Sequence, residues 1–306
     1  NSITGNDTLS KQGGTIYIKR GTYSCRTKVD IRENMHVMGD GPDSTVINMS
    51  DQAYFQVQGT SITVDEFGNS AVREQIPNVK FSRIGVNGAL HSTSGITGRI
   101  QVIQVSDDSI YNMTLDDVRF KGGAYLDTNG VVTNYVVDLG SNSYDVASRD
   151  IKILNSRFEV CGGGIQLQGA RNVKVNNCVF VSEDFGAENF TFEGMLEGIT
   201  LTGPPSTNSE YNNFRYGQSN KRASGDISIT NCSFSGKHTT STSSIPERGW
   251  IYITSQFTGP NINISGCNFT GDILGSVSET AFPDSTTKSE GTCILNMALT
   301  NVSVSN

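Results

Sequence analysis

The chain has 306 residues, with 33 glycines, 27 asparagines, an apolar fraction of 35% and a charged fraction of 17%. This composition excludes a coiled coil, a helical bundle and a charged disordered tail, because amphipathic stretches rich in helix formers are nearly absent. The net charge is −7, with no run of five like charges and no basic stripe, so nucleic acid is not a predicted partner. No stretch approaches the roughly 18 apolar residues of a membrane span, so membrane insertion is not predicted.

A nine-residue pattern recurs along the chain and decides the predicted fold. Positions two and four are apolar in every copy, which is the period-two alternation of a strand with one buried face. Position six is Gly, Asn or Asp in seven of the eight copies, with Arg83 as the exception, and these residues predict a sharp bend through left-handed backbone. The copies begin at Asn34, Asn78, Asn112, Asp150, Asn172, Asp226, Asn261 and Asn301.

A second short strand follows the bend, and its positions seven and nine are expected to point inward. Position seven includes Cys178, Cys232 and Cys267, which predicts buried thiols without disulfides, because neighbouring side chains of an in-register parallel ladder point the same way. Asn at the bend is expected to hydrogen-bond to its counterpart one coil away. Position nine is a predicted aromatic ladder of Phe120, Phe158, Phe180, Phe234 and Phe269.

A third strand with an apolar–polar–apolar pattern precedes most copies. Its examples are Ile103-Gln104-Val105, Val137-Asp138-Leu139, Ile165-Gln166-Leu167, Ile199-Thr200-Leu201 and Ile251-Tyr252-Ile253. Three strands and an Asn bend make one coil of a parallel β-helix, so the sequence predicts an all-β, single-stranded β-helix over 1–306 as one domain. The shortest spacing between copies is 22 residues. Longer spacings predict loop insertions, the larger ones at 181–197, 203–225, 236–248 and 270–292.

The opening segments Gly13-Gly14-Thr15-Ile16-Tyr17, Asn34-Met35-His36-Val37-Met38-Gly39 and Thr45-Val46-Ile47 resemble the first coils of the pectate-lyase-like right-handed β-helix superfamily. Within it, the chain is most similar to the branch of bacteriophage tailspike and appendage proteins, the polysaccharide depolymerases. The resemblance implies a right-handed coil, a homotrimer, and recognition of a bacterial surface polysaccharide, with or without cleavage, at the virion tail or outside the cell. Since the chain begins at Asn1 and its last copy stops at Asn306, it is expected to be a fragment of a longer chain.

The catalytic motifs of related enzymes are largely missing. Asp107-Asp108 is the only fragment of the polygalacturonase set, and it has the chemistry of an ordinary turn. The Gly-His-Gly, Arg-Ile-Lys, alginate-epimerase and classical pectate-lyase signatures do not occur. A hydrolase or lyase activity therefore stays an open alternative to binding alone.

The predicted site lies beside Ile199-Thr200-Leu201, between an acidic insertion at 181–197 and an aromatic and cationic one at 203–225. Sugar rings stack on aromatic side chains, and their hydroxyls bond to polar groups, so these insertions are expected to wall a groove. Alternation places the polar residue of each third strand on an outward floor, with Val136, Gly164, Gly198 and Trp250 also outward. The predicted substrate-binding residues are Gln166, Gln168, Thr200, Tyr211, Arg215, Tyr216, Trp250 and Tyr252.

Glycoside hydrolysis requires two carboxylates, about 5–5.5 Å apart for retention and about 6.5–9.5 Å apart for inversion. The predicted proton donor is Glu183, Asp184 or Glu197, and Asp138 or another loop acid is the predicted partner. Alternatively, the acidic insertion is a solvated surface. For Trp250 and Tyr252, the alternative to stacking on a sugar is packing under a loop or against another subunit.

Two other functions remain open at the level of sequence. One is a secreted bacterial lyase or glycoside hydrolase, for which the outward lysines Lys80, Lys152 and Lys174 are the ladder-based candidates for a lyase base. The other is a structural or adhesive β-helix without catalysis. No cofactor and no zinc site are predicted, because the three histidines are scattered, whereas calcium among loop acids stays open.

Overall fold

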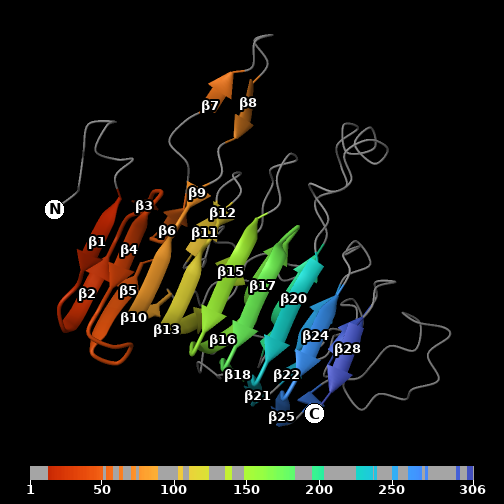
Figure 1. Ribbon diagram of the computed structural model, residues 1–306. Helices are drawn as coiled ribbons and strands as arrows, with labels where there is room; N and C mark the ends of the chain where they lie inside the picture. Colours follow the sequence, from red (N-terminus) through yellow and green to blue (C-terminus); the bar gives the residue numbers. More distant parts are fainter. Residues whose placement is uncertain are drawn as a thin grey trace, which may run out of the picture.

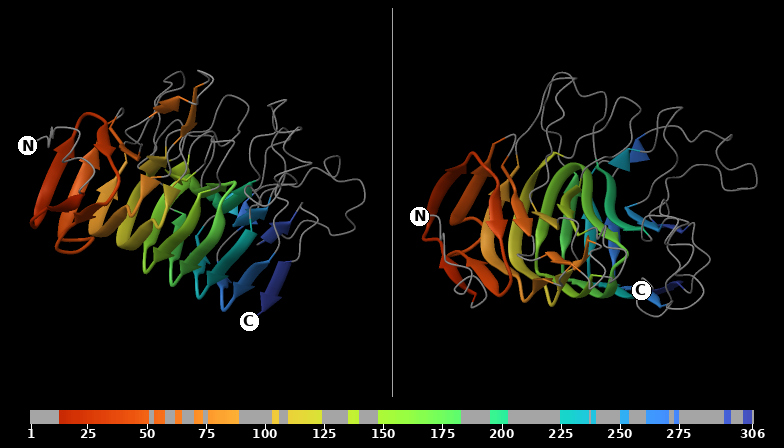
Figure 2. Two further views of the ribbon diagram at one scale, coloured as in Figure 1. Left: turned by 45° about the horizontal axis from the view of Figure 1, so that its top comes forward. Right: turned by 90° about the horizontal axis from the view of Figure 1, so that it is seen from above.

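The chain forms a parallel β-helix, as the repeat predicts (Figure 1). The computed structural model describes residues 13–50, 53–57, 62–64, 70–73, 76–88, 103–105, 110–123, 135–139, 148–182, 195–202, 225–236, 238–239, 250–253, 261–270, 273–274, 294–296 and 302–305. Figure 2 shows successive coils stacked along the chain, from red at the N-terminal end to blue at the C-terminal end. Within the described residues, no helix has the length and apolar character needed to cross a bilayer.

Each coil contributes strands to three faces, which we number in chain order. Face 1 consists of β1 (Gly14–Tyr17), β4 (Met35–Met38), the first parts of β10 (Lys80–Asn87) and β13 (Thr114–Gly123), β15 (Arg149–Leu154), β17 (Arg171–Asn176), β20 (Gly225–Thr230), β24 (Ile262–Ser265) and β28 (Val302–Ser305). Face 2 consists of β2 (Gly21–Cys25), β5 (Thr45–Met49), the second parts of β10 and β13, the first part of β16 (Arg157–Gln168), β18 (Val179–Ser182), β21 (Ser233–Ser235) and β25 (Asn268–Thr270).

Face 3 is the sheet formed by the apolar–polar–apolar strands. It consists of β3 (Val29–Ile31), β6 (Phe55–Val57), β11 (Ile103–Val105), β14 (Tyr135–Asp138), the second part of β16, β19 (Met195–Thr202), β23 (Ile251–Ile253) and β27 (Ile294–Asn296). Four short strands extend the pairing: β9 (Ile76–Pro77), β12 (Ile110–Tyr111), β22 (His238–Thr239) and β26 (Ile273–Leu274). All of these pairs are parallel, and the β16–β19 pair shifts register once, between Gly162 and Gly163. Equivalent residues of successive coils therefore form rows.

The core is a column between the three faces, and the predicted aromatic ladder lies in it. Phe120, Phe158, Phe180 and Phe234 are all 0% exposed. Their ring centroids are 5.1, 4.8 and 4.7 Å apart, and Phe269 continues the stack 4.8 Å from Phe234. Such pairs contribute about 0.5–1.5 kcal/mol each beyond the burial of their surface.

The thiols at position seven are free, as predicted, and two of the three are buried as predicted. Cys178 and Cys232 are buried, Cys267 is half-buried, and all three are free. A hydrogen bond with Cys178 raises the pKa of Cys232 to about 12, so this thiol stays protonated near neutral pH. These cysteines therefore fill space in the core.

Each described face-1 strand from β4 to β24 begins at a left-handed corner, and a second such corner follows where face 1 turns into face 2. The second is the predicted bend, where Asn155 and Asn177 have φ of 52° and 54°. The first was not predicted: the Asn or Asp at position one, read as a strand start, has φ of 50° to 62° in every described copy. At the second corner Arg83 is left-handed (φ 56°), whereas Gly39 is not among the positive-φ residues. Gly39 serves close packing instead, because an added Cβ would lie 2.6 Å from the Arg83 carbonyl oxygen.

Side-chain amides link these corners from coil to coil, as predicted for the bend. At the second corner, Asn177 Nδ2 donates to Asn155 Oδ1 at 2.9 Å, and Asn155 Nδ2 donates to Asp116 Oδ1 at 2.9 Å. The first corner carries its own ladder, in which Asn78 Nδ2 donates to Asn34 Oδ1 at 2.7 Å and Asn112 Nδ2 donates to Asn78 Oδ1 at 2.6 Å. Two polar ladders therefore hold the edges of face 1.

One element has no counterpart in the predicted repeat. Strands β7 (Ile62–Val64) and β8 (Ser70–Arg73) form an antiparallel hairpin that projects from the coils between β6 and β9 (Figure 1). The predicted insertions lie mostly outside the described residues, although β18 and β19 extend to Ser182 and begin at Met195, inside the predicted limits of the first insertion. The assignment of 1–306 to one domain stays a prediction.

Candidate functional site

A single row of outward positions runs along face 3 and forms the candidate site. Gln104 pairs in register with Asp138, Asp138 with Gln166, Gln166 with Thr200, and Thr200 with Tyr252, as predicted. The row also extends toward the N-terminus, since Gln56 pairs with both Gln104 and Asp30. We call these positions the polar row: Asp30, Gln56, Gln104, Asp138, Gln166, Thr200 and Tyr252.

The N-terminal extension of the polar row was missed from the sequence, although a signal for it exists. Val29-Asp30-Ile31 and Phe55-Gln56-Val57 have the same apolar–polar–apolar pattern as the later strands. Lys28 Nζ lies 3.1 Å from Asp30 Oδ1, so the terminal carboxylate of the row is paired with a cation. The row is therefore longer than the predicted floor and is mostly neutral in character.

Burial confirms that the polar row faces away from the core at three of the predicted positions. Asp138, Gln166 and Tyr252 are half-buried, whereas the apolar residues on either side of each are 0% exposed. Strand alternation explains this directly, because successive side chains of a strand point to opposite faces. Amide, carboxylate and phenol groups thus line one side of the sheet at successive coils, about 4.8 Å apart.

Trp250 does not lie on the outward face, and this prediction is wrong. Its side chain is 4% exposed, and its ring centroid lies 5.9 Å from that of Phe234 in the core. Alternation fails here because the residue before the first inward isoleucine of a face-3 strand also faces the core: Val136, at the equivalent position, is 0% exposed. Gly198 has no side chain at that position, and an added Cβ would lie 3.1 Å from Phe234 Cε1. Trp250 is therefore a core residue, not a platform for sugar stacking.

Thr200 needs a smaller correction. It holds its predicted place in the polar row between Gln166 and Tyr252, but it is only 2% exposed. A threonine side chain is much shorter than the glutamine and tyrosine on the adjacent coils, so it lies below them. Gln166 and Tyr252 are consequently the better placed of the three to contact a ligand.

Several predicted residues fall outside what the structure describes. Glu183, Asp184, Tyr211, Arg215 and Tyr216 lie in 183–194 and 203–224, so their roles stay predictions. The backbones of Gln168 and Glu197 belong to β16 and β19, where Gln168 pairs with Thr202 and Glu197 with Gly163. The acidic and aromatic walls of the predicted groove thus rest on the sequence alone.

In the polar row, neither described neighbour of Asp138 is a carboxylate. Asp138 has glutamines beside it in the row, Gln104 on one side and Gln166 on the other. The backbone of Glu197 lies two coils from that of Asp138, about 10 Å along the stack, and three residues before Thr200, about 10 Å across it. Their Cα atoms are therefore about 14 Å apart, so Glu197 is not an adjacent-coil neighbour of Asp138. The polar row has the chemistry of a binding surface.

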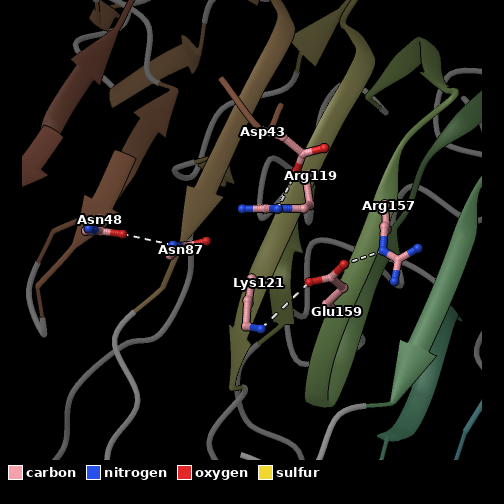
Figure 3. A network of polar contacts seen from close by, with 7 residues as sticks. All are labelled: Asp43, Asn48, Asn87, Arg119, Lys121, Arg157 and Glu159. Atoms are coloured by element: carbon pink, nitrogen blue, oxygen red, sulfur yellow. Dashed lines mark hydrogen bonds and ion pairs between the residues drawn. The ribbon is translucent and has the colours of Figure 1, made fainter. Parts of the chain in front are cut away.

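A charged network lies on face 2 (Figure 3). Glu159, only 7% exposed, pairs with Arg157, and its Oε2 lies 3.9 Å from Lys121 Nζ on the neighbouring coil. Arg119 pairs with Asp43. Beside them Asn87 Nδ2 donates to Asn48 Oδ1 at 2.8 Å. Each of these charges has an opposite charge nearby, as expected for a network that stabilises the sheet.

The lysines considered as lyase bases lie on face 1, away from the polar row. Lys80 pairs in register with His36 and Thr114, and Lys152 pairs with Lys174. No observation links them to a second functional group on face 3. Among the described residues, no group of three or more His, Cys, Asp or Glu side chains is placed to hold a metal ion.

Structural comparison finds β-helix proteins of several activities. A mutant tailspike protein of E. coli bacteriophage HK620, in complex with a pentasaccharide, aligns with 97% of this chain and 44% of its own, at 14% identity and a TM-score of 0.49. A tailspike protein of Acinetobacter baumannii bacteriophage Fri1, described as a capsular polysaccharide depolymerase, aligns over 94% of this chain and 60% of its own, at 11% identity and a TM-score of 0.36. The A-module of an Azotobacter vinelandii mannuronan C-5 epimerase aligns over 96% and 85%, at 13% identity and a TM-score of 0.35.

By sequence, no protein-family model and no curated protein matches the chain. The chain spans less than half the length of the HK620 tailspike protein.

Proposed function

We propose that this chain is the receptor-binding β-helix of a phage tailspike, which binds a bacterial surface polysaccharide along the polar row of face 3. The row itself carries the proposal: polar side chains recur at one position of successive coils, above an apolar core. An extended glycan presents hydroxyl groups at regular intervals, and amide and carboxylate groups are suited to bond them. The half-buried ring of Tyr252 adds an aromatic surface at one end of the row.

The chemistry of the row favours binding over cleavage within the described residues. Hydrolysis needs a second carboxylate near Asp138, and only Glu197 or the acids of 181–197 are candidates for it. The proposal therefore separates two steps: recognition by Gln56, Gln166 and Tyr252, and a cleavage step that depends on Asp138 with Glu183, Asp184 or Glu197.

Assembly and location belong to the same proposal. The opening coils resemble those of tailspike proteins, which favours a homotrimer on a virion tail that attaches to the host cell. Two of the similar structures are described as a tailspike bound to a pentasaccharide and as a capsular polysaccharide depolymerase. The ligand class proposed for this chain is the same, and it is argued from the residues of the polar row.

Incubation with capsule, O-antigen and teichoic-acid preparations tests the function. Pull-down of one polysaccharide measures binding, and assays of reducing ends and of unsaturated uronates separate hydrolysis from elimination. We expect Gln166→Ala to weaken binding several-fold and Asn268→Ala, an exposed amide on face 2, to leave it unchanged. Equal binding by both variants would remove face 3 as the site.

Amide substitutions of the acids test the cleavage step separately. Asp138→Asn and Glu197→Gln should abolish any release of oligosaccharide while binding persists. Full release of oligosaccharide by both variants would exclude these acids as the catalytic pair. The proposal of binding would not be affected.

A further inference from the structure

A cluster of four cations lies on face 1, and its members are not adjacent in the sequence. Arg149 and Lys152 belong to β15, and Arg171 and Lys174 belong to β17 on the next coil. Arg149 pairs in register with Arg171, and Lys152 with Lys174. All four are exposed. We call them the cationic quartet, and they correct the expectation that this acidic chain has no basic stripe.

The two lysines are not neutralised within the described structure. Arg171 Nε lies 3.7 Å from Asp226 Oδ2, and the Arg149 guanidinium lies 5.4 Å from the centre of the Tyr111 ring. Lys152 and Lys174, in contrast, take part in none of the ion pairs between described residues. Like charges directly opposite each other on neighbouring strands destabilise a sheet. On face 2, Arg119 and Arg157 also lie opposite each other, but each has a carboxylate partner, Asp43 and Glu159 respectively. Lys152 and Lys174 have no such partner among the described residues.

The surroundings of the quartet indicate the kind of anion that fits. The row that contains the two lysines continues as Thr114 on one side and as Ser228 and Asn263 on the other. The nearby corner carboxylates already accept amide hydrogen bonds, Asp150 from Asn172 and Asp226 from Asn261. Beyond Thr114 the row reaches a third lysine, Lys80. A ligand along this row thus meets a cation and a hydroxyl group, then a positive patch two coils wide, then hydroxyl and amide groups.

We propose that the cationic quartet binds the anionic groups of an acidic polysaccharide, at a site separate from the polar row. Such a polymer carries carboxylate or phosphate groups among many hydroxyls, which matches the alternation of charge and neutral polar groups along the row. A nucleic acid fits less well, because its continuous line of phosphates would meet neutral rows and the carboxylates of Asp150 and Asp226. The two lysines supply compact charge for the ligand, and the two arginines beside them add to the positive potential of the patch.

Binding of polygalacturonate tests the proposal, with poly(glycerol phosphate), neutral dextran and duplex DNA as the other probes. Affinity is measured by titration at low and at moderate salt. The intact chain should bind polygalacturonate or poly(glycerol phosphate), whichever source of anion it prefers, with an affinity that falls as salt rises. Tighter binding of DNA than of both acidic polymers, or equal binding of dextran, would overturn the proposal.

The variant Lys152→Gln/Lys174→Gln should weaken binding of the acidic polymer at least tenfold and reduce its salt dependence. The matched control Lys19→Gln/Arg26→Gln removes two exposed cations from the first coil and should leave binding unchanged. Lys152→Arg/Lys174→Arg keeps the charge and should keep most of the binding. Unchanged affinity in the glutamine variant contradicts the proposal.

Two further measurements keep this test independent of folding and of the proposed function. Because Lys152 and Lys174 repel each other, Lys152→Gln should raise the melting temperature in the absence of ligand, and a fall would contradict the unpaired state of the lysines. Gln166→Ala, on the polar row, should not change binding of the acidic polymer. Loss of acidic-polymer binding in the Gln166→Ala variant would show that the polar row and the cationic quartet are not separate sites, and would overturn the proposal.

Discussion

Face 3 and face 1 share one core and one coil spacing, yet they present opposite chemistry. The polar row of face 3 contains amides, two carboxylates, a threonine and a tyrosine, and its terminal carboxylate, Asp30, is paired with Lys28. The equivalent row of face 1 contains Lys80, Lys152 and Lys174 between hydroxyl and amide residues. Inward residues of both faces belong to one apolar core. The outward residues therefore decide what each face binds.

This division is possible because alternation separates stability from function along each strand. Ile151 and Ile153 are 0% exposed and hold β15 in the column, while Lys152 between them is exposed. The same holds for Gln166 between Ile165 and Leu167 on face 3. A β-helix can therefore change the ligand of one face without changing the other, and the predictions below test how independent the two faces are.

The largest expected effect comes from breaking the core beneath both faces. Phe158 is 0% exposed and stacks between Phe120 and Phe180 at 5.1 and 4.8 Å. Phe158→Ala should lower the free energy of unfolding by about 3–5 kcal/mol, measured by urea denaturation, because it leaves a cavity in the ladder. Phe158→Leu should lower the free energy of unfolding by a clearly smaller amount. A loss below about 1 kcal/mol for the alanine variant would show that the column is not packed as described.

The second-largest expected effect comes from the left-handed corners at the edges of face 1. Asn177 has φ 54° and donates to Asn155 at 2.9 Å. Asn177→Ala should destabilise the protein by about 2 kcal/mol, from left-handed strain together with a lost hydrogen bond. Asn177→Gly removes only the hydrogen bond and should cost about 1 kcal/mol. Equal losses in the two variants would mean that backbone strain plays no part.

Exchanging one residue between the faces tests their chemistry directly. Gln166→Lys places a face-1 side chain in the polar row and should weaken binding of the polysaccharide recognised by face 3 about 2–10-fold, by loss of a neutral hydrogen-bonding group. Lys174→Gln makes the reverse change on face 1 and should leave that binding unaltered. Titration with the polysaccharide identified by pull-down compares the affinities of the two variants. Equal losses of affinity would contradict the proposal that the two faces act separately.

The smallest expected effect is a pH dependence near His36, which lies on face 1 beside Lys80. Burial, and then the charge of Lys80, lower the pKa of His36 below its usual 6.5. The unfolded chain therefore takes up a proton before the folded one does, so this contribution to stability is present above about pH 6.5 and is lost as pH falls through the lowered pKa. His36→Gln should flatten that part of the stability profile. An unchanged profile would contradict the assignment.

The repeat predicted the fold well because each coil repeats the same physical requirements. Alternating apolar residues, the Phe ladder and the Asn at position six are local signals, and the structure places them as expected. The first left-handed corner, at position one, was missed because Asn and Asp also begin strands, although Asn or Asp at position one in all eight copies was the available signal. The β7–β8 hairpin lies in a segment without the repeat, so periodicity says nothing about it.

The prediction of the site was wrong where the alternation of side chains along a strand does not by itself determine which way a residue points. Trp250 was assigned outward by counting residues, but the residue before the inward isoleucine faces the core beside Phe234, in the space that Gly198 leaves. Lys152 and Lys174 of the cationic quartet were predicted to point outward from one ladder, but the two arginines beside them were overlooked. Arg149 and Arg171 are 22 residues apart in sequence, which is one coil, so only alignment of the coils makes them neighbours.

The central claim, that the polar row of face 3 holds a glycan, is tested most directly by a crystal structure of the chain with an oligosaccharide of the polysaccharide identified by pull-down. The account predicts sugar rings that lie across successive coils of face 3, with hydroxyl groups within hydrogen-bonding distance of Gln56 or Gln166 and a ring against Tyr252. A neutral oligosaccharide bound instead on face 1 or face 2, with the polar row unoccupied, would contradict it.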